Sequence, residues 1–167
     1  MARQLDQPDN AYLPGVAWRS RAGEVSGIMQ MPGELQPLAR AAWTRRHEFV
    51  RRCWQAGVRV TTGTDGAGLG RLLPGFGLHR EIVLLREAGL PPFASLQAAT
   101  INAARALNLA DQIGSIETGK AADFGVWTAD PVTTALRPAD LGAVVLAGVV
   151  HRRDALAAAL GSGVREG

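Results

Sequence analysis

Gly57-Val-Arg-Val-Thr-Thr-Gly-Thr-Asp65 is the stretch that decides how this chain folds. Its valines alternate with arginine and threonine, and this period of two predicts a short buried strand over Val58–Thr62. Asp65 then follows the C-terminal end of that strand, where α/β folds place their catalytic groups. We therefore take Asp65 as the first candidate catalytic residue. The alternative is that its side chain only caps a turn.

Helical patterns lie on both sides of this stretch. Apolar residues recur at threes and fours from Pro37 to Ala56, and they include Leu38 and Phe49. Gly57 is well placed to end that helix. We expect a second helix over about 78–88, ended by Gly89, and a third over 91–108 with a break near residues 100–102.

The last third of the chain changes character. Turn-forming residues fill 113–120, and strands are expected over Phe124–Thr128 and Val144–Val150, with Gly148 in a turn or bulge of the second. A short helix is expected over Asp154–Leu160. Residues 1–36 show no sustained period, so we treat them as a poorly specified lead-in. The predicted division is 1–36, 37–110 and 111–167.

Composition indicates a globular protein. The chain has 167 residues, of which 47% are apolar and 20% charged. No apolar run reaches the roughly 18–20 residues needed to span a bilayer, and the first twenty residues lack the apolar core of a secretory signal. Cys53 is the single cysteine, which we interpret as a buried thiol. We expect a cytoplasmic protein that does not bind membranes.

The net charge of +3 could suggest a nucleic-acid partner. The basic residues cluster only over 45–52, however, and Glu48 is placed to pair with Arg52 at a spacing of four. Aromatic residues do not alternate with these arginines to stack on bases. The pattern favours a solvated helix face, so no nucleic-acid partner is expected.

A glycine-rich run and three histidines are the other candidates for specific sites. The glycines of Gly66-x-Gly-x-Gly70 miss the spacing of a dinucleotide loop, which argues against nucleotide binding. Of the three histidines, His47 and His151 are expected at the surface. His79 follows Asp65 by about fourteen residues, across a loop that could fold back, and is the candidate substrate-binding residue.

Several motifs together resemble the metal-dependent amidohydrolases, in the order found in the C-terminal portion of imidazolonepropionase-like and prolidase-like members. Beyond the 57–65 stretch, these motifs are Pro74-Gly-Phe-Gly-Leu-His-Arg-Glu-Ile82, Ala88-Gly-Leu-Pro-Pro-Phe-Ala-Ser-Leu-Gln-Ala-Ala-Thr100, Asn102-Ala-Ala-Arg-Ala-Leu107, Ile113-Gly-Ser-Ile-Glu-Thr-Gly-Lys-Ala-Ala-Asp123 and Val149-Val-His-Arg-Arg-Asp-Ala-Leu156. The resemblance covers about residues 37–160.

The resemblance implies an α/β fold: the C-terminal part of a TIM-like (β/α)8 barrel, plus strands of a small composite β-sandwich. It makes Asp65 a ligand of a divalent metal, usually zinc, that also takes a proton from the attacking water and passes it to the leaving nitrogen. The implied activity is hydrolysis of amide or cyclic C–N bonds in a small-molecule substrate.

The family's other metal-binding side chains have no counterparts in this sequence. Its His-x-His pair, its bridging lysine and its two later histidines are absent, and a complete barrel takes roughly 250 residues. We therefore expect the chain to be inactive alone and to hold zinc only if the missing ligands are supplied. A complementary N-terminal chain or a homo-oligomer could supply them. The alternative is a non-catalytic remnant or association module.

Overall fold

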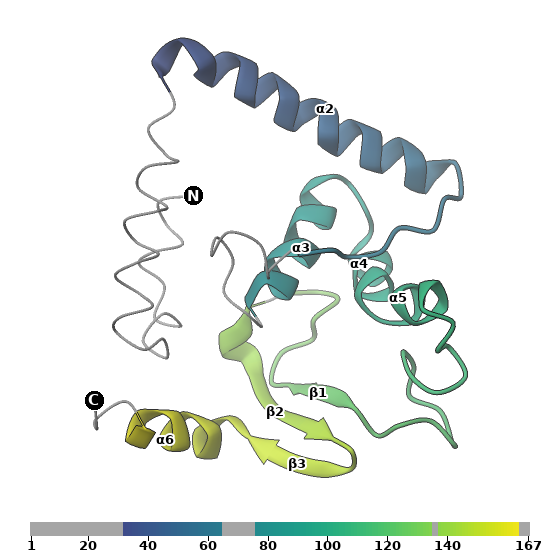
Figure 1. The fold of residues 1–167 in the computed structure, drawn as a ribbon, viewed down its shortest axis with the longest axis vertical. Coiled ribbons are helices and arrows are strands. Elements are labelled where there is room, and N and C mark those ends of the chain that lie inside the picture. Colours follow the sequence, from purple (N-terminus) through teal and green to yellow (C-terminus); the bar gives the residue numbers. More distant parts are fainter. Residues whose placement is uncertain (1–31, 65–75, 135–136, 164–167) are drawn as a thin grey trace.

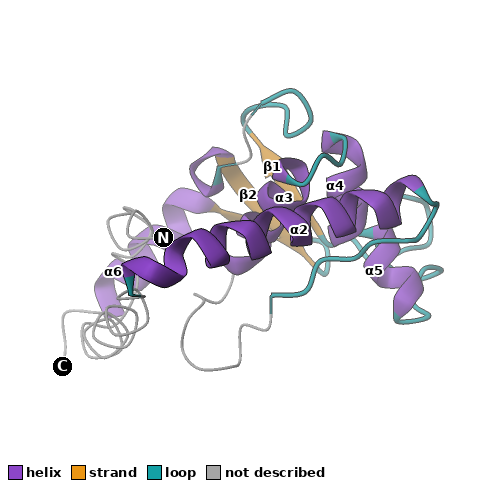
Figure 2. Cartoon of the chain, turned by 90° about the horizontal axis from the view of Figure 1, so that it is seen from above, coloured by secondary structure: helices purple, strands orange, loops and turns teal. Residues whose placement is uncertain are grey.

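The computed structural model describes residues 32–64, 76–134 and 137–163. A short 3-10 turn, η3 (Gly33–Leu35), leads into the long helix α2 (Gln36–Gln55). Below α2 lie the shorter helices α3 (Phe76–Glu87), α4 (Pro92–Ala99) and α5 (Ile101–Ala106), and a small antiparallel sheet with the last helix lies beneath them (Figure 1). Figure 2 shows from above that α2 runs across α3 and the strands. In the described ranges, no helix combines the length and apolarity needed to cross a bilayer.

Three helices end with the same hydrogen-bonded motif, which explains where the chain turns. Gly57 has φ +80°, its N–H donates to the carbonyl of Trp54, and the N–H of Val58 donates to the carbonyl of Cys53. This is the Schellman arrangement, which satisfies the last carbonyls of a helix. Gly89 (φ +100°) repeats it after α3, and Asn108 (φ +58°) repeats it after α5. The predicted ends at Gly57 and Gly89 are confirmed.

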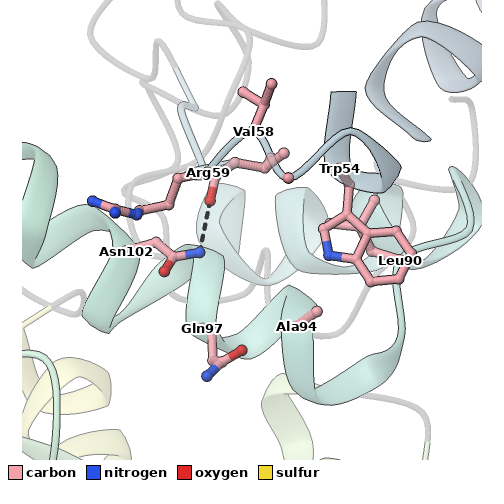
Figure 3. A pocket seen from close by; sticks show the side chains of 9 residues that line it. Trp54, Val58, Arg59, Leu90, Ala94, Gln97 and Asn102 are labelled. Atoms are coloured by element: carbon pink, nitrogen blue, oxygen red, sulfur yellow. Dashed lines mark hydrogen bonds between the residues drawn. The ribbon is translucent and has the colours of Figure 1, made fainter. Parts of the chain in front are cut away.

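The predicted break in the third helix is also confirmed. Thr100 separates α4 from α5 with φ −127° and ψ −100°, outside the helical region. Its hydroxyl donates to the carbonyl of Leu96 at 2.8 Å, a side-chain bond that competes with the helical pattern. The break redirects α5, so that the amide of Asn102 faces the segment that follows α2 (Figure 3).

The core among the helices is small. Leu85, Leu90 and Ala98 are buried together, and Val50, Trp54 and Val60 pack against them. One face of α2 therefore contributes to the core. The helix predicted over Pro37–Ala56 is confirmed, but Leu38 and Phe49, which carry part of its spacing, are each 68% exposed. Val50 and Trp54 face the core and these two residues do not, so the apolar residues of α2 extend beyond the face that the core covers.

Residues 58–64 do not form the predicted strand. This part of the chain, which we call the 58–64 segment, has neither helix nor strand and runs back beneath α2 (Figure 1). A strand is defined by backbone bonds to a neighbouring strand, and none of the described strands lies beside this segment. The alternating valines differ in burial, since Val60 packs on the core while Val58 is 54% exposed.

The C-terminal part contains a three-stranded antiparallel sheet in the order β1 (Phe124–Trp127), β2 (Leu141–Leu146), β3 (Val149–Arg152). The predicted strand over Phe124–Thr128 is confirmed. The single strand predicted over Val144–Val150 is wrong, because the chain reverses inside it and Leu146 pairs with Val149. Helix α6 (Arg153–Gly163) follows, so the helix predicted over Asp154–Leu160 is confirmed and extends beyond those bounds.

The reversal is a two-residue turn with positive φ at both positions, +50° at Ala147 and +80° at Gly148. That geometry matches the right-handed twist of a hairpin, but alanine adopts it with strain. Asp123 stabilises the turn, since its carboxylate accepts the Ala147 N–H at 2.6 Å. The Gly148 N–H donates to the carbonyl of Ala122 at 3.1 Å. Gly148 was therefore predicted correctly as a turn residue.

Candidate functional site

Asp65, the leading candidate from the sequence, lies outside the described residues, and its role stays a prediction. The structure does describe the 58–64 segment that leads to it. The direction of that segment is fixed at its start by the Schellman turn at Gly57 and further along by contacts with α4 and α5. The candidate site is therefore built from this segment and its supports.

Two hydrogen bonds hold the 58–64 segment against the helices. The Thr62 N–H donates to the carbonyl of Ala98 at 3.2 Å, and the side-chain amide of Asn102 donates to the carbonyl of Val60 at 3.1 Å (Figure 3). Ala98 is fully buried, so the first of these bonds lies inside the protein. Together they fix the path of the chain over the last residues before Asp65.

A hollow of about 190 Å³ lies beside the segment. Ligand pockets usually measure roughly 300–1,000 Å³, so this hollow is small for a substrate site. In Figure 3, Trp54 lies beside Leu90 at one end and Asn102 beside Arg59 at the other. The full lining is Trp54, Gly57, Val58, Arg59, Val60, Leu90, Ala94, Gln97 and Asn102. By itself the hollow is a gap in the packing next to the segment.

His79, the predicted substrate-binding residue, lies in the first turn of α3 and is half-buried. Its ring meets the indole of Trp127 edge to face, with the ring centroids 5.6 Å apart. It thereby joins the helices to β1. Because the chain between Asp65 and α3 is not described, a contact between His79 and Asp65 stays a prediction.

The other histidines and the cysteine are placed in structural positions. His47 on α2 is half-buried, which corrects the expectation of a surface position, and its ring contacts that of Trp43 at a tilt of 55° with the centroids 4.8 Å apart. His151 is half-buried opposite Val144 in the sheet, which corrects the expectation that it is exposed. Cys53 is also half-buried, less enclosed than predicted. In the described part of the chain, no three His, Cys, Asp or Glu side chains come together to hold a metal.

Two of the arginines of α2 pair with one carboxylate. Glu48 accepts from Arg52 at 2.7 Å, as the spacing of four predicts, and also forms an ion pair with Arg51. The hydrogen bond from Arg52, followed by that from Arg51, lowers the pKa of Glu48. Both arginines are exposed. These residues therefore form a solvated helix face, as the sequence predicted.

A buried polar connection that the sequence did not predict centres on Arg86. Its guanidinium donates to Ser95 Oγ at 3.0 Å, to the carbonyl of Pro131 at 2.6 Å and to the carbonyl of Thr134 at 3.2 Å. Ser95 is fully buried and donates in turn to the carbonyl of Pro92 at 2.6 Å. Burial lowers the pKa of Arg86, although an arginine remains charged. One side chain thus ties α3 to α4 and to the chain that follows β1.

We expect Arg86→Met to lower the free energy of unfolding by about 2 kcal/mol, because a charged donor to two partly buried acceptors and one exposed acceptor is lost. Arg80→Met is the matched control. Arg80 makes only an exposed ion pair with Glu87 at 3.3 Å among the described residues, so it should cost less than about 0.5 kcal/mol. Urea unfolding followed by tryptophan fluorescence measures both. Equal losses would contradict the connecting role of Arg86.

Asn102 is the second residue whose role the sequence left unassigned. An asparagine inside a helical pattern is a weak helix former, and its amide needs partners when it is half-buried. That mismatch was a usable signal for a tertiary contact. Arg86 carried no such signal, because two of its three acceptors are backbone carbonyls more than forty residues along the chain.

Comparison with known proteins gives a family match. Residues 26–151 match the sequence profile described as the Amidohydrolase family. A 5-methylthioadenosine/S-adenosylhomocysteine deaminase of Desulforudis audaxviator is 40% identical over 84 residues, which are 47% of this chain and 20% of that protein. An imidazolonepropionase of Aromatoleum aromaticum is 42% identical over 78 residues, 44% of this chain and 18% of that protein.

The fold gives the same kind of match. A solved Xaa-Pro dipeptidase with methionine bound in its active site superposes with a TM-score of 0.56 and 28% sequence identity. The superposition covers 64% of this chain and 25% of the dipeptidase. The chain therefore spans about a fifth of the length of these curated relatives and a quarter of that solved structure.

Proposed function

The chain belongs to the amidohydrolase family, and from this premise we propose that it takes part in metal-dependent hydrolysis of amide or cyclic C–N bonds. The observation that carries the proposal is the family match over residues 26–151, within which the 58–64 segment is held in place immediately before Asp65. Within the proposal, α2 to α5 are the C-terminal part of a TIM-like barrel, and β1 to β3 are strands of a small β-sandwich.

Asp65 is the residue proposed to act on the substrate. A carboxylate at this point can accept a proton from the attacking water and return it to the leaving nitrogen. In sequence it follows Thr64, the last residue of a segment whose path is set by bonds to Ala98 and Asn102, and this supports the proposal. His79 is proposed as a residue that contacts the substrate.

The described residues do not fit a metal on their own, because no three ligating side chains come together among them. Catalytic zinc sites use three protein ligands. The proposal therefore needs ligands from beyond the described residues, supplied by a complementary chain or by a homo-oligomer. Zinc is the metal that the family resemblance implies.

The substrate class follows from what the relatives have in common. The deaminase of Desulforudis audaxviator and the solved Xaa-Pro dipeptidase are named for reactions that break a bond between carbon and nitrogen. We propose a small molecule with such a bond as the substrate of this chain's site.

The test is a chimera of the Desulforudis audaxviator deaminase in which residues 37–123 of this chain replace their counterparts. The chimera retains the relative's remaining residues and receives Asp65 from this chain. With zinc added, it should deaminate 5-methylthioadenosine, measured by ammonia release. A folded chimera that contains zinc and shows no turnover would contradict the proposal.

A second candidate function is a non-catalytic association module. The observation in its favour is the apolar surface of the described part: Leu38 and Phe49 on α2 are each 68% exposed, and Val149 and Val150 on β3 are 57% and 62% exposed. Such surfaces commonly mark interfaces. The chimera distinguishes the candidates, since an association module without catalytic function would leave the folded, zinc-containing chimera without turnover.

A further inference from the structure

A side chain of α5 holds the backbone of the 58–64 segment. The Nδ2 amide of Asn102, in the first turn of α5, donates to the carbonyl of Val60 at 3.1 Å, across 42 positions of the chain (Figure 3). Both residues are half-buried. Early in a helix, asparagine commonly bonds to nearby backbone as a cap. Here no residue caps α5 with its side chain, and the amide is used for a distant partner.

The bond from Asn102 acts together with a second attachment. The Thr62 N–H donates to the carbonyl of Ala98 at 3.2 Å, so the segment is joined to α5 at Val60 and to α4 two residues later. A chain held at one point can pivot about it, whereas two attachments close together fix both its position and its direction. Without the amide of Asn102, the part of the segment nearest Asp65 would keep only the bond at Thr62.

Asp65 follows Thr62 by three residues. Covalent geometry allows at most about 11 Å between two Cα atoms three residue steps apart, so the attachments limit where the carboxylate can lie. A proton passes between a water and a carboxylate when their oxygens are about 2.6–3.2 Å apart. A misplacement of about 1 Å can lower a rate by about 100-fold. A small shift of the segment is therefore enough to slow the reaction.

We propose that Asn102 is a positioning residue for the hydrolysis: through the carbonyl of Val60, it sets the place from which the chain continues to Asp65. The inference rests on the proposed function. Asn102 acts through the backbone and does not contact the substrate. Loss of its amide should lower kcat and leave KM nearly unchanged, because the reacting group is displaced while the contacts that bind the substrate are kept.

The test compares Asn102→Leu with Gln97→Met in the chimera, since each change replaces an amide by an apolar side chain of similar size. Gln97 lines the same hollow, but its side chain points away from the segment and makes no hydrogen bond among the described residues (Figure 3). At saturating zinc, Asn102→Leu should lower kcat for 5-methylthioadenosine by about 10- to 100-fold, with KM within about twofold. Gln97→Met should leave both within about twofold. Ammonia release measures both constants.

Backbone amide hydrogen exchange in the full chain without metal gives a readout that does not depend on turnover. Asn102→Leu should speed exchange of the Thr62 amide by about fivefold, the equivalent of one ordinary hydrogen bond, and Gln97→Met should leave it within about twofold. The amide of Leu85, in the buried core, reports any general loss of stability. Equal acceleration at Thr62 and Leu85 would overturn the inference, because Asn102 would then stabilise the whole protein and not the segment.

Asn102→Gln tests whether the donor itself is needed. Glutamine keeps the amide on a side chain that is longer by one methylene, and the hollow of about 190 Å³ beside Asn102 has room for it. We expect this variant to keep kcat within about fivefold of the parent chimera. A kcat as low as that of Asn102→Leu would count against the hydrogen bond and overturn the inference.

The outcomes separate the two proposals. A parent chimera that is folded and contains zinc but shows no turnover contradicts the hydrolytic function, and the positioning role falls with it. An active parent chimera in which Asn102→Leu retains its kcat overturns the positioning role alone and leaves the proposed function in place.

Discussion

Asp65→Asn in the active chimera should reduce kcat/KM for 5-methylthioadenosine by about 100- to 10,000-fold, the usual contribution of a positioned acid–base group. Asparagine keeps the shape of the side chain but cannot accept a proton from water and return it to the leaving nitrogen. The measurement is ammonia release at saturating zinc, together with the zinc content of each purified protein. The zinc content shows whether the loss includes weaker metal binding.

The matched control is Asp111→Asn. Asp111 is exposed, and its carboxylate makes no hydrogen bond or ion pair among the described residues. The same chemical change there should leave kcat/KM within about twofold, since exposed substitutions away from a site have small effects. Turnover retained by Asp65→Asn would place the proton transfer on another residue and remove the central element of the proposed function.

Features of the fold that depend on neighbouring residues could be predicted from the sequence. Gly57 and Gly89 end their helices because a positive φ suits glycine and the bonds that close the turn lie within the preceding turn of helix. The break at Thr100 is local for the same reason, since its hydroxyl bonds to Leu96 four residues earlier. Asn108 ends α5 in the same way, but asparagine is a weaker signal than glycine.

Features that depend on distant partners could not be predicted. The strand expected over Val58–Thr62 would need a neighbouring strand to pair with, and the periodicity of one segment does not show whether such a strand lies beside it. The same limit applies to α2, where Val50 packs on the core while Phe49 is 68% exposed. In β2 and β3 the apolar run was continuous, and only Gly148 marked the reversal within it.

The candidate site, too, could be predicted only where its features are local in the sequence. The motif that ends at Asp65 could be found from its resemblance to a family, and the family itself is confirmed. The contact of His79 with Trp127 and the bonds from Arg86 to the carbonyls of Pro131 and Thr134 join residues 45 or more positions apart in the chain. Such contacts follow from how the helices and the sheet pack, which no local pattern specifies.

The largest stability effect is expected for Gly114→Ala. Gly114 has φ +96°, which L-residues adopt at a cost of roughly 1–2 kcal/mol. A Cβ there would lie 2.7 Å from the Cβ of Ala104 and 3.0 Å from the Cα of Ile101. Ala104 is only 2% exposed, so α5 would have to move, and overpacking of this kind costs roughly 1–3 kcal/mol more. We expect a total loss of about 3 kcal/mol in the free energy of urea unfolding.

Gly119→Ala separates the two causes. Gly119 has nearly the same φ, +92°, but an added Cβ would meet no heavy atom of the described residues within 4 Å. It should therefore show only the conformational cost of about 1 kcal/mol. The difference between the two variants measures how closely the turn at Gly114 packs against α5. Equal losses would mean that this packing does not stabilise the protein, and the 113–120 connection would then be held by its own hydrogen bonds, such as that from Lys120 to Ser115 at 2.6 Å.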